Sequence, residues 1–314
     1  MTTGRRAPAT APRRWRILAP VAVAAMAGVA LAWLVRADGG FPAAACARVV
    51  ADVAGASVLG LAALPRLDAR LRVDWRPLAV IAGVWFAAEF AVLAGEAADI
   101  VGVPVRALRA ADFGTFLTEL SGGQIGIAIL FCTGALACYA AVAFRRPDAA
   151  SADLVLVFAA VALALRPITG HMSQQMFGSV LAAVHALAAA TWLGLLLAMA
   201  LVLRTRGGWA STLPVYSRVA APLVLAIALT GLIDGLVRIG GIEPLWTSGY
   251  GRILVAKFAV LCALTGLGWW WRRTWVTQAA NHRVTIETSL RNAVLEVTLM
   301  AVGFGLAATL AITA

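Results

Sequence analysis

The sequence predicts an all-α fold: a polytopic membrane helix bundle of about nine transmembrane helices, with the N-terminus inside and the C-terminus outside. Of the 314 residues, 62% are hydrophobic and 13% are charged, whereas a soluble domain is about 25% charged. Apolar runs of roughly the 20 residues needed to cross a bilayer recur along the chain. The basic residues gather in alternate segments between these runs, which is typical of a membrane protein with a fixed orientation.

The apolar runs favour helices over barrel strands, because they are long and do not alternate with polar residues. We expect nine spans, at about 17–35, 46–64, 78–98, 123–144, 152–168, 179–203, 217–238, 251–271 and 291–312. The first run follows a cluster of arginines that could belong to a cleavable signal peptide. Because the run is long and a second span follows closely, we expect an uncleaved first helix.

Orientation follows from the distribution of basic residues. With the N-terminus inside, 18 basic residues fall on the inner side and seven on the outer side, while Lys257 lies within a span. Cytoplasmic segments carry the excess of positive charge, so the segment between the fifth and sixth spans is predicted to be outside. The same placement explains the net charge of +11 without a nucleic-acid partner.

No stretch is polar enough for a separate soluble domain, so we expect one integral membrane domain over 1–314. It would comprise a cytoplasmic basic tail (1–16), N-terminal helices (17–150) and a core (151–314). The segment 99–122 is mildly amphipathic and predicts a short helix at the outer interface. The four cysteines lie in apolar runs without CxxC spacing, and we interpret them as small core residues.

The stretch from Thr169 to Met199 gathers candidate metal ligands. His171, Met172 and Met176 lie in a polar segment that leads into an apolar helix carrying His185. Imidazole and thioether groups suit copper, and thioether selects Cu(I). The pattern predicts a site for Cu(I) or Cu(II) at the outer mouth of the bundle, with the two histidines as principal ligands and the two methionines as additional ones. Alternatively, His185 hydrogen-bonds a neighbouring helix and the methionines only fill space.

Ionisable residues inside a membrane are functional candidates. Glu89 and Glu96 are seven residues apart and should share one face of the third span. We expect structural ion pairs of such charges; a proton relay or a cation path through Glu89 and Glu96 is the alternative. Asp52 and Asp234 each have an arginine four residues away as a possible partner, Arg48 and Arg238. Glu296 could meet Arg291 or Lys257.

The span of His185 carries two further signals. Trp192 is seven residues from His185 and should share its face, and Gly194 would allow close helix contact. No serine–histidine–acid order, phosphate loop or dinucleotide fingerprint is present, so we do not expect an enzyme.

These residues resemble a known family. The run GHMSQQMFGSVLAAVHALAAATWLGLLLAM is similar to the signature of the CopD copper-resistance membrane domain, with a Gly-His pair, a second histidine and Trp-Leu-Gly. The segments YSRVAAPLVLAIALTGL and SGYGRILVAKFAVL resemble later parts of the same family, and Glu296 falls where it often has an acid. The first half, with DVAGASVLGLAALP, resembles actinobacterial members, in which the domain can be fused to a cytochrome oxidase assembly domain.

The resemblance implies a multi-pass inner (plasma) membrane protein of copper transport or resistance, with 151–314 as the CopD-like core. His171 and His185 match the family's two histidines; Tyr250, Arg252 and Lys257 match its motif without an assigned role. Copper ions and the lipid bilayer would be its partners, with an extracytoplasmic copper-binding protein or oxidase assembly components as possible protein partners. Two alternatives stay open: an oxidase copper-delivery or assembly factor without transport, and a haem-binding electron carrier with His171 and His185 as axial ligands.

Overall fold

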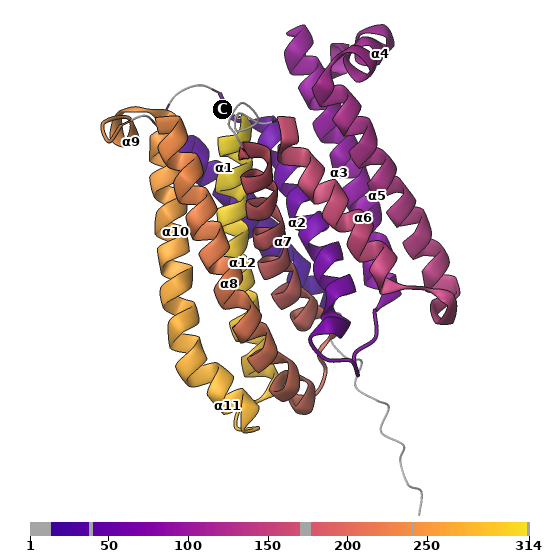
Figure 1. Cartoon of the computed structure of the whole chain (residues 1–314), viewed down its shortest axis with the longest axis vertical. Helices are drawn as coiled ribbons and strands as arrows, with labels where there is room; N and C mark the ends of the chain where they lie inside the picture. Colours follow the sequence, from indigo (N-terminus) through magenta and orange to yellow (C-terminus); the bar gives the residue numbers. More distant parts are fainter. Residues whose placement is uncertain (1–13, 38–39, 170–176, 240, 313–314) are drawn as a thin grey trace, which may run out of the picture.

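The computed structural model of the chain describes residues 14–37, 40–169, 177–239 and 241–312. These residues form helices joined by short turns, with no strand among them. The elements are α1 (Leu18–Arg36), α2 (Ala43–Ala63), α3 (Trp75–Val101), α4 (Ala110–Glu119), α5 (Ser121–Arg145), α6 (Ala152–Leu165), α7 (Gly178–Val202), α8 (Arg206–Ile239), α9 (Pro244–Thr247), α10 (Gly249–Trp271), α11 (Thr277–Ala280) and α12 (Ile286–Ile312). The predicted all-α bundle is confirmed (Figure 1).

Within the described residues, eight helices are long and apolar enough to cross a membrane. The remaining predicted span forms α6, which has 14 residues and is shorter than the others because Pro167 follows it. Figure 1 shows α6 running through the bundle beside α5. The described residues therefore show eight helices of spanning length and a ninth, shorter helix, α6, beside them. That α6 also crosses the membrane stays a prediction.

The first and last spans are parallel neighbours. A Cβ atom on Gly28 would lie 2.3 Å from the Val302 carbonyl oxygen, and one on Gly305 would lie 2.2 Å from the Ala25 carbonyl oxygen. Small residues permit such close backbone approach between membrane helices. Parallel α1 and α12 require an odd number of passes, so α1 begins at the lower end of the bundle in Figure 1 and α12 finishes at the upper end. Which end faces the cytoplasm stays a prediction.

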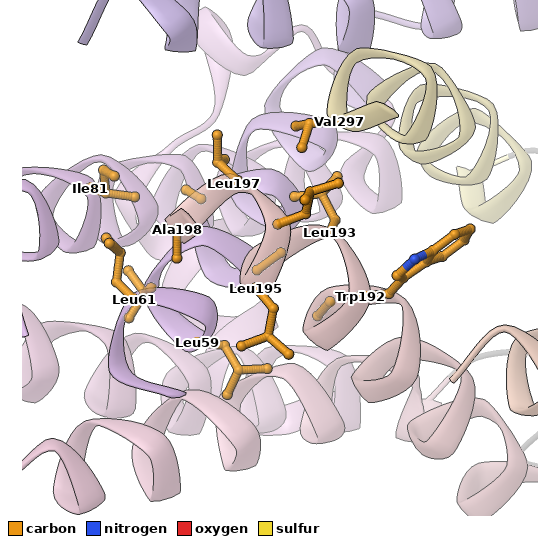
Figure 2. Packing of buried hydrophobic residues seen from close by; sticks show 14 of the residues in the cluster. Leu59, Leu61, Ile81, Trp192, Leu193, Leu195, Leu197, Ala198 and Val297 are labelled. Carbon is orange, nitrogen blue, oxygen red and sulfur yellow. The ribbon is translucent and has the colours of Figure 1, made fainter. Parts of the chain in front are cut away.

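The centre of the bundle is the crossing of α2 and α7. A Cβ atom on Gly194 would lie 1.9 Å from the Ala56 carbonyl oxygen, which confirms the close contact predicted for this glycine. Figure 2 shows the side chains that pack around the crossing: Leu59, Leu61, Ile81, Leu193, Leu195, Leu197, Ala198 and Val297. On one side, α3, α5 and α6 cover this pair; on the other lie α8 and α10 (Figure 1).

The 99–122 segment contains the predicted short helix. It is α4, which packs on α3 and α5 through the buried ring of Phe116. Gly102 ends α3 with a φ of 75°, a conformation that favours glycine. The position of α4 at a membrane interface stays a prediction.

The cysteines do not all lie in the core. Cys132 is buried, but Cys138 and Cys262 are exposed on the outside of the bundle. The core interpretation is wrong for these two, because the outer surface of a membrane bundle accepts apolar side chains as readily as its interior does.

Candidate functional site

A cavity of about 1440 Å³ lies between the helices in the upper half of the bundle. Its walls come mainly from α2, α3, α5, α7, α8, α10 and α12 and from the turn after α6. Most of the wall is apolar, and the ionisable side chains that line it are Arg48, Asp52, Glu89, Glu96, Arg166, His185, Asp234 and Lys257. They form two groups, one around His185 and one around Glu89.

His185 is held by a hydrogen bond to the neighbouring helix α8. Its Nδ1 lies 2.8 Å from the Thr230 hydroxyl oxygen, and that hydroxyl lies 2.6 Å from the Ala226 carbonyl oxygen. A hydroxyl has one proton, which Thr230 donates to the carbonyl, so Nδ1 of His185 is the donor to Thr230. The other ring nitrogen, Nε2, therefore carries the lone pair that a metal would use.

Lys257 occupies the space in front of that lone pair. Its Nζ lies 3.5 Å from His185 Nε2. Both side chains line the cavity, as does Asp234 on α8, which interacts electrostatically with Lys257. The Lys257 ammonium thus has two neighbours in the cavity wall, the His185 imidazole and the Asp234 carboxylate, and it can interact with either one.

The second group joins α2, α3 and the turn after α6. Arg166 forms an ion pair with Glu89, and its Nε lies 3.9 Å from Asp52 Oδ1. Glu89 also accepts a hydrogen bond of 2.8 Å from the Trp85 indole, and Glu96 pairs with Arg48 at 3.8 Å.

These contacts confirm one sequence expectation and correct another. Glu89 and Glu96 share the cavity-facing side of α3, as their spacing predicts. The predicted pairing of Asp52 with Arg48 on its own helix is wrong, because other helices bring opposite charges nearer to both residues. The sequence placed Arg166 on the outer side, whereas its side chain points into the bundle. The signal for this inward direction was its position directly after a short apolar span.

Of the four predicted ligands, the structure describes one. His185 lies in the cavity wall, and Trp192 lines the same cavity, as their shared face predicts. His171, Met172 and Met176 lie outside the described residues. Within the described part of the chain, no group of three His, Cys, Asp or Glu side chains is arranged to hold a metal ion.

The remaining motif residues have separate surroundings. Arg252 donates to the carbonyls of Val35, at 2.8 Å, and Arg36, so it caps the open carbonyls at the end of α1. The guanidinium carbon of Arg238 lies 4.4 Å from the centre of the Tyr250 ring. These two contacts stabilise the upper end of the bundle beside the cavity.

Glu296 is not paired with Arg291 or Lys257, and that expectation is wrong. It is buried on α12, where the Tyr216 hydroxyl donates to its Oε1 at 3.5 Å. Arg291 is exposed at the surface, and Lys257 lies closer to the upper end of the bundle, in the cavity.

Comparison with known proteins identifies the C-terminal segment. Residues 210–310 match the model of the family described as Copper resistance protein D. The chain carries a CopD-family copper resistance domain. The CopD match covers roughly a third of the chain, from α8 to α12, and includes Thr230, Asp234, Lys257 and Glu296. No curated protein and no solved structure matches the chain. The protein is therefore a multi-pass membrane protein related to copper resistance.

Proposed function

We propose that the protein binds copper in the upper cavity at His185 and passes it across the membrane. The observation that carries this proposal is the hydrogen bond between His185 Nδ1 and Thr230. Because Nδ1 holds the ring proton in this bond, the lone pair of Nε2 is available to a metal ion. His185 lies in the wall of a cavity of about 1440 Å³, beside the segment that matches CopD. Imidazole is a good copper ligand, and a hydrogen bond to the second ring nitrogen is how proteins fix the orientation of a metal-binding histidine.

The other ligands would come from the segment that precedes α7. His171, Met172 and Met176 lie nine to fourteen residues before His185 in the sequence. The described part of this connection supports their approach, because the Ser179 hydroxyl at the start of α7 donates to the Ile168 carbonyl at 3.3 Å. The two described ends of the connection, at Ile168 and Ser179, therefore lie close together beside the cavity wall that carries His185. Imidazole and thioether donors together would favour Cu(I).

Lys257 would hold the site when copper is absent. Two unit charges about 4 Å apart interact by about 4 kcal/mol at the effective dielectric near a protein surface, so a copper ion at Nε2 and an ammonium at the observed place of Lys257 oppose each other strongly. Copper binding would therefore move the Lys257 side chain away from His185 and toward Asp234. In this proposal the lysine is a tethered cation that the cargo displaces.

The inner (plasma) membrane and an outward-facing cavity are part of the proposal. They are supported by the arginine distribution, which puts the segment before α7 outside, and by the depth of His185, about two turns from the start of α7. The cargo would enter from, or leave to, the extracytoplasmic side.

Copper binding to purified protein in detergent tests the proposal. Wild type, His185→Ala and a matched control, Thr133→Val, would be titrated with Cu(I) against a chromophoric chelator, and bound metal counted by elemental analysis. Thr133 is buried on α5 and bonds its own helix at 2.9 Å, so its variant should bind as wild type does. His185→Ala should lose the tightest copper; equal affinity and stoichiometry would contradict the site.

Copper content of cells separates transport from delivery. The double variant His171→Ala/His185→Ala, at matched expression, should change cellular copper relative to wild type. Unchanged copper together with co-purifying oxidase subunits would instead favour an assembly factor.

A further inference from the structure

A second polar site lies beneath the cavity, at one depth in the membrane. Trp192, Tyr216 and Glu296 are each ten residues from the lower end of their helices, α7, α8 and α12. At 1.5 Å per residue, each side chain sits about 15 Å above that end. The consecutive helices α7 and α8, together with the distant α12, therefore bring an indole, a phenol and a carboxyl to the same level.

The three groups are close to one another and to the cavity floor. The Tyr216 hydroxyl lies 3.5 Å from Glu296 Oε1, and the Trp192 indole N–H is close enough to the same hydroxyl oxygen to interact with it as a donor. Trp192 and Met300 line the cavity, and Met300 is one turn above Glu296 on α12. Figure 2 shows the Trp192 ring directed away from the leucine cluster around α2 and α7.

Glu296 has no basic partner among the described residues. Its side chain is 6% exposed, and it takes part in none of the ion pairs found there. On α8 the ionisable group that faces it is Tyr216. The ionisable groups of the other packed helices lie at other depths: Asp52 on α2, His185 on α7 and Lys257 on α10 line the cavity, and Arg14 before α1 binds the lower end of α7.

An isolated buried carboxylate is costly unless a positive charge compensates it. Since the described side chains supply none, a bound proton or a metal cation would have to compensate the carboxylate. The cavity is the nearby source of either, because Met300, one helical turn from Glu296, lines it.

The polar groups also continue toward the lower end. Trp209, Thr212 and Tyr216 follow one another at spacings of three and four along one face of α8, and all three are buried. In the described part of the chain, Trp209 Nε1 and Thr212 Oγ1 have no hydrogen-bond partner although their side chains are more than nine-tenths buried. Buried polar atoms are ordinarily satisfied, so two unsatisfied ones below the cavity, on the α8 face of Tyr216, point to a path that receives a polar guest.

We propose that Glu296, with Tyr216 and Trp192, is an inner cation-binding site through which positive charge passes between the cavity and the lower end of the bundle. The inference rests on the proposed function for its cargo. The shared chemistry is a single positive charge on the Glu296 carboxylate, either the copper ion itself or a proton exchanged for it.

Flux through purified protein in liposomes tests the inference. Copper movement would be followed with an enclosed Cu(I)-responsive dye, and proton movement with an enclosed pH dye. Glu296→Gln, which keeps the side-chain volume, should lower copper flux at least tenfold while copper binding at His185 stays at the wild-type affinity. Thr133→Val, the buried-hydroxyl control, should leave flux unchanged.

The two sources of charge separate in the same samples. If copper occupies Glu296, the variant should bind one copper fewer than wild type. If a proton does, copper stoichiometry should be unchanged, and the pH change that accompanies copper flux in wild type should disappear. Either result supports the inner site.

Other outcomes overturn it. Glu296→Gln flux within twofold of wild type, with a folded protein by size-exclusion chromatography, would remove the inner site and leave the outer one intact. If Glu296→Gln does not fold, Tyr216→Phe serves in its place and should also reduce flux; wild-type flux in that variant overturns the inference. Copper binding without flux in wild type would refute both transport and the inner site, whereas no copper binding in wild type would refute the proposed function itself.

Discussion

Lys257 Nζ and His185 Nε2 lie 3.5 Å apart across the cavity wall. The contact joins α10, within the CopD match, to α7, which lies before it. It directs the one lysine of the sequence at the imidazole lone pair that would bind copper.

Replacing Lys257 by leucine should strengthen copper binding. The variant removes a charge that opposes copper at Nε2 and adds no donor atom, and about 1.4 kcal/mol corresponds to a tenfold change in affinity. We expect at least a tenfold tighter Cu(I) affinity in the chelator competition. Lys257→Arg keeps the charge and should not bind more tightly than wild type; a tighter Lys257→Arg, or an unchanged Lys257→Leu, would contradict the role of the ammonium.

Replacing Thr230 by valine should weaken copper binding. Valine keeps the shape but removes the oxygen that accepts from His185 Nδ1 at 2.8 Å. Loss of such an orienting partner typically costs about 10- to 100-fold in metal affinity. The measurement is the same competition, and Thr265→Val is its control, since Thr265 is exposed on α10 and bonds its own helix. Wild-type affinity in Thr230→Val would show that the ring is oriented by something else.

Replacing Gly194 by alanine should destabilise the whole bundle. The added methyl group would meet the Ala56 carbonyl oxygen at 1.9 Å, which forces α2 and α7 apart, and overpacking of this kind costs about 1–3 kcal/mol. The unfolding temperature in detergent should fall. Gly83→Ala is the matched control, because a Cβ at Gly83 has no atom within 4 Å; equal stability of the two variants would contradict the crossing.

Asp68, between α2 and α3, should make stability depend on pH in the acid range. The Arg70 backbone N–H, at 3.0 Å, and then the Ser211 hydroxyl, at 2.8 Å, donate to its carboxylate and hold the pKa of Asp68 below its usual value. A lowered pKa in the folded state adds stability that is fully present above the ordinary carboxyl pKa of about 3.9 and is lost as pH falls through the lowered value.

Asp68→Asn should therefore unfold at a lower temperature than wild type at neutral pH, and the difference should shrink on acidification. Asp148→Asn, at an exposed position, is the control and should follow wild type. A difference between Asp68→Asn and wild type that stays constant with pH would show that the carboxylate charge has no part in it.

The sequence by itself determined the helical passes and the faces they present. A segment inside a lipid bilayer must satisfy its backbone hydrogen bonds internally, so long apolar runs predict helices. The helical period then places Glu89 on the same face as Glu96, and His185 on the same face as Trp192. Tertiary structure decided which charges meet. Three contacts between residues distant in the sequence show this: Arg166 with Glu89, Lys257 with His185, and Tyr216 with Glu296. The paired residues are 77, 72 and 80 positions apart, respectively. Spacing along one helix carries no information on such pairs, because they are set by which helices pack together and by their relative depth and rotation.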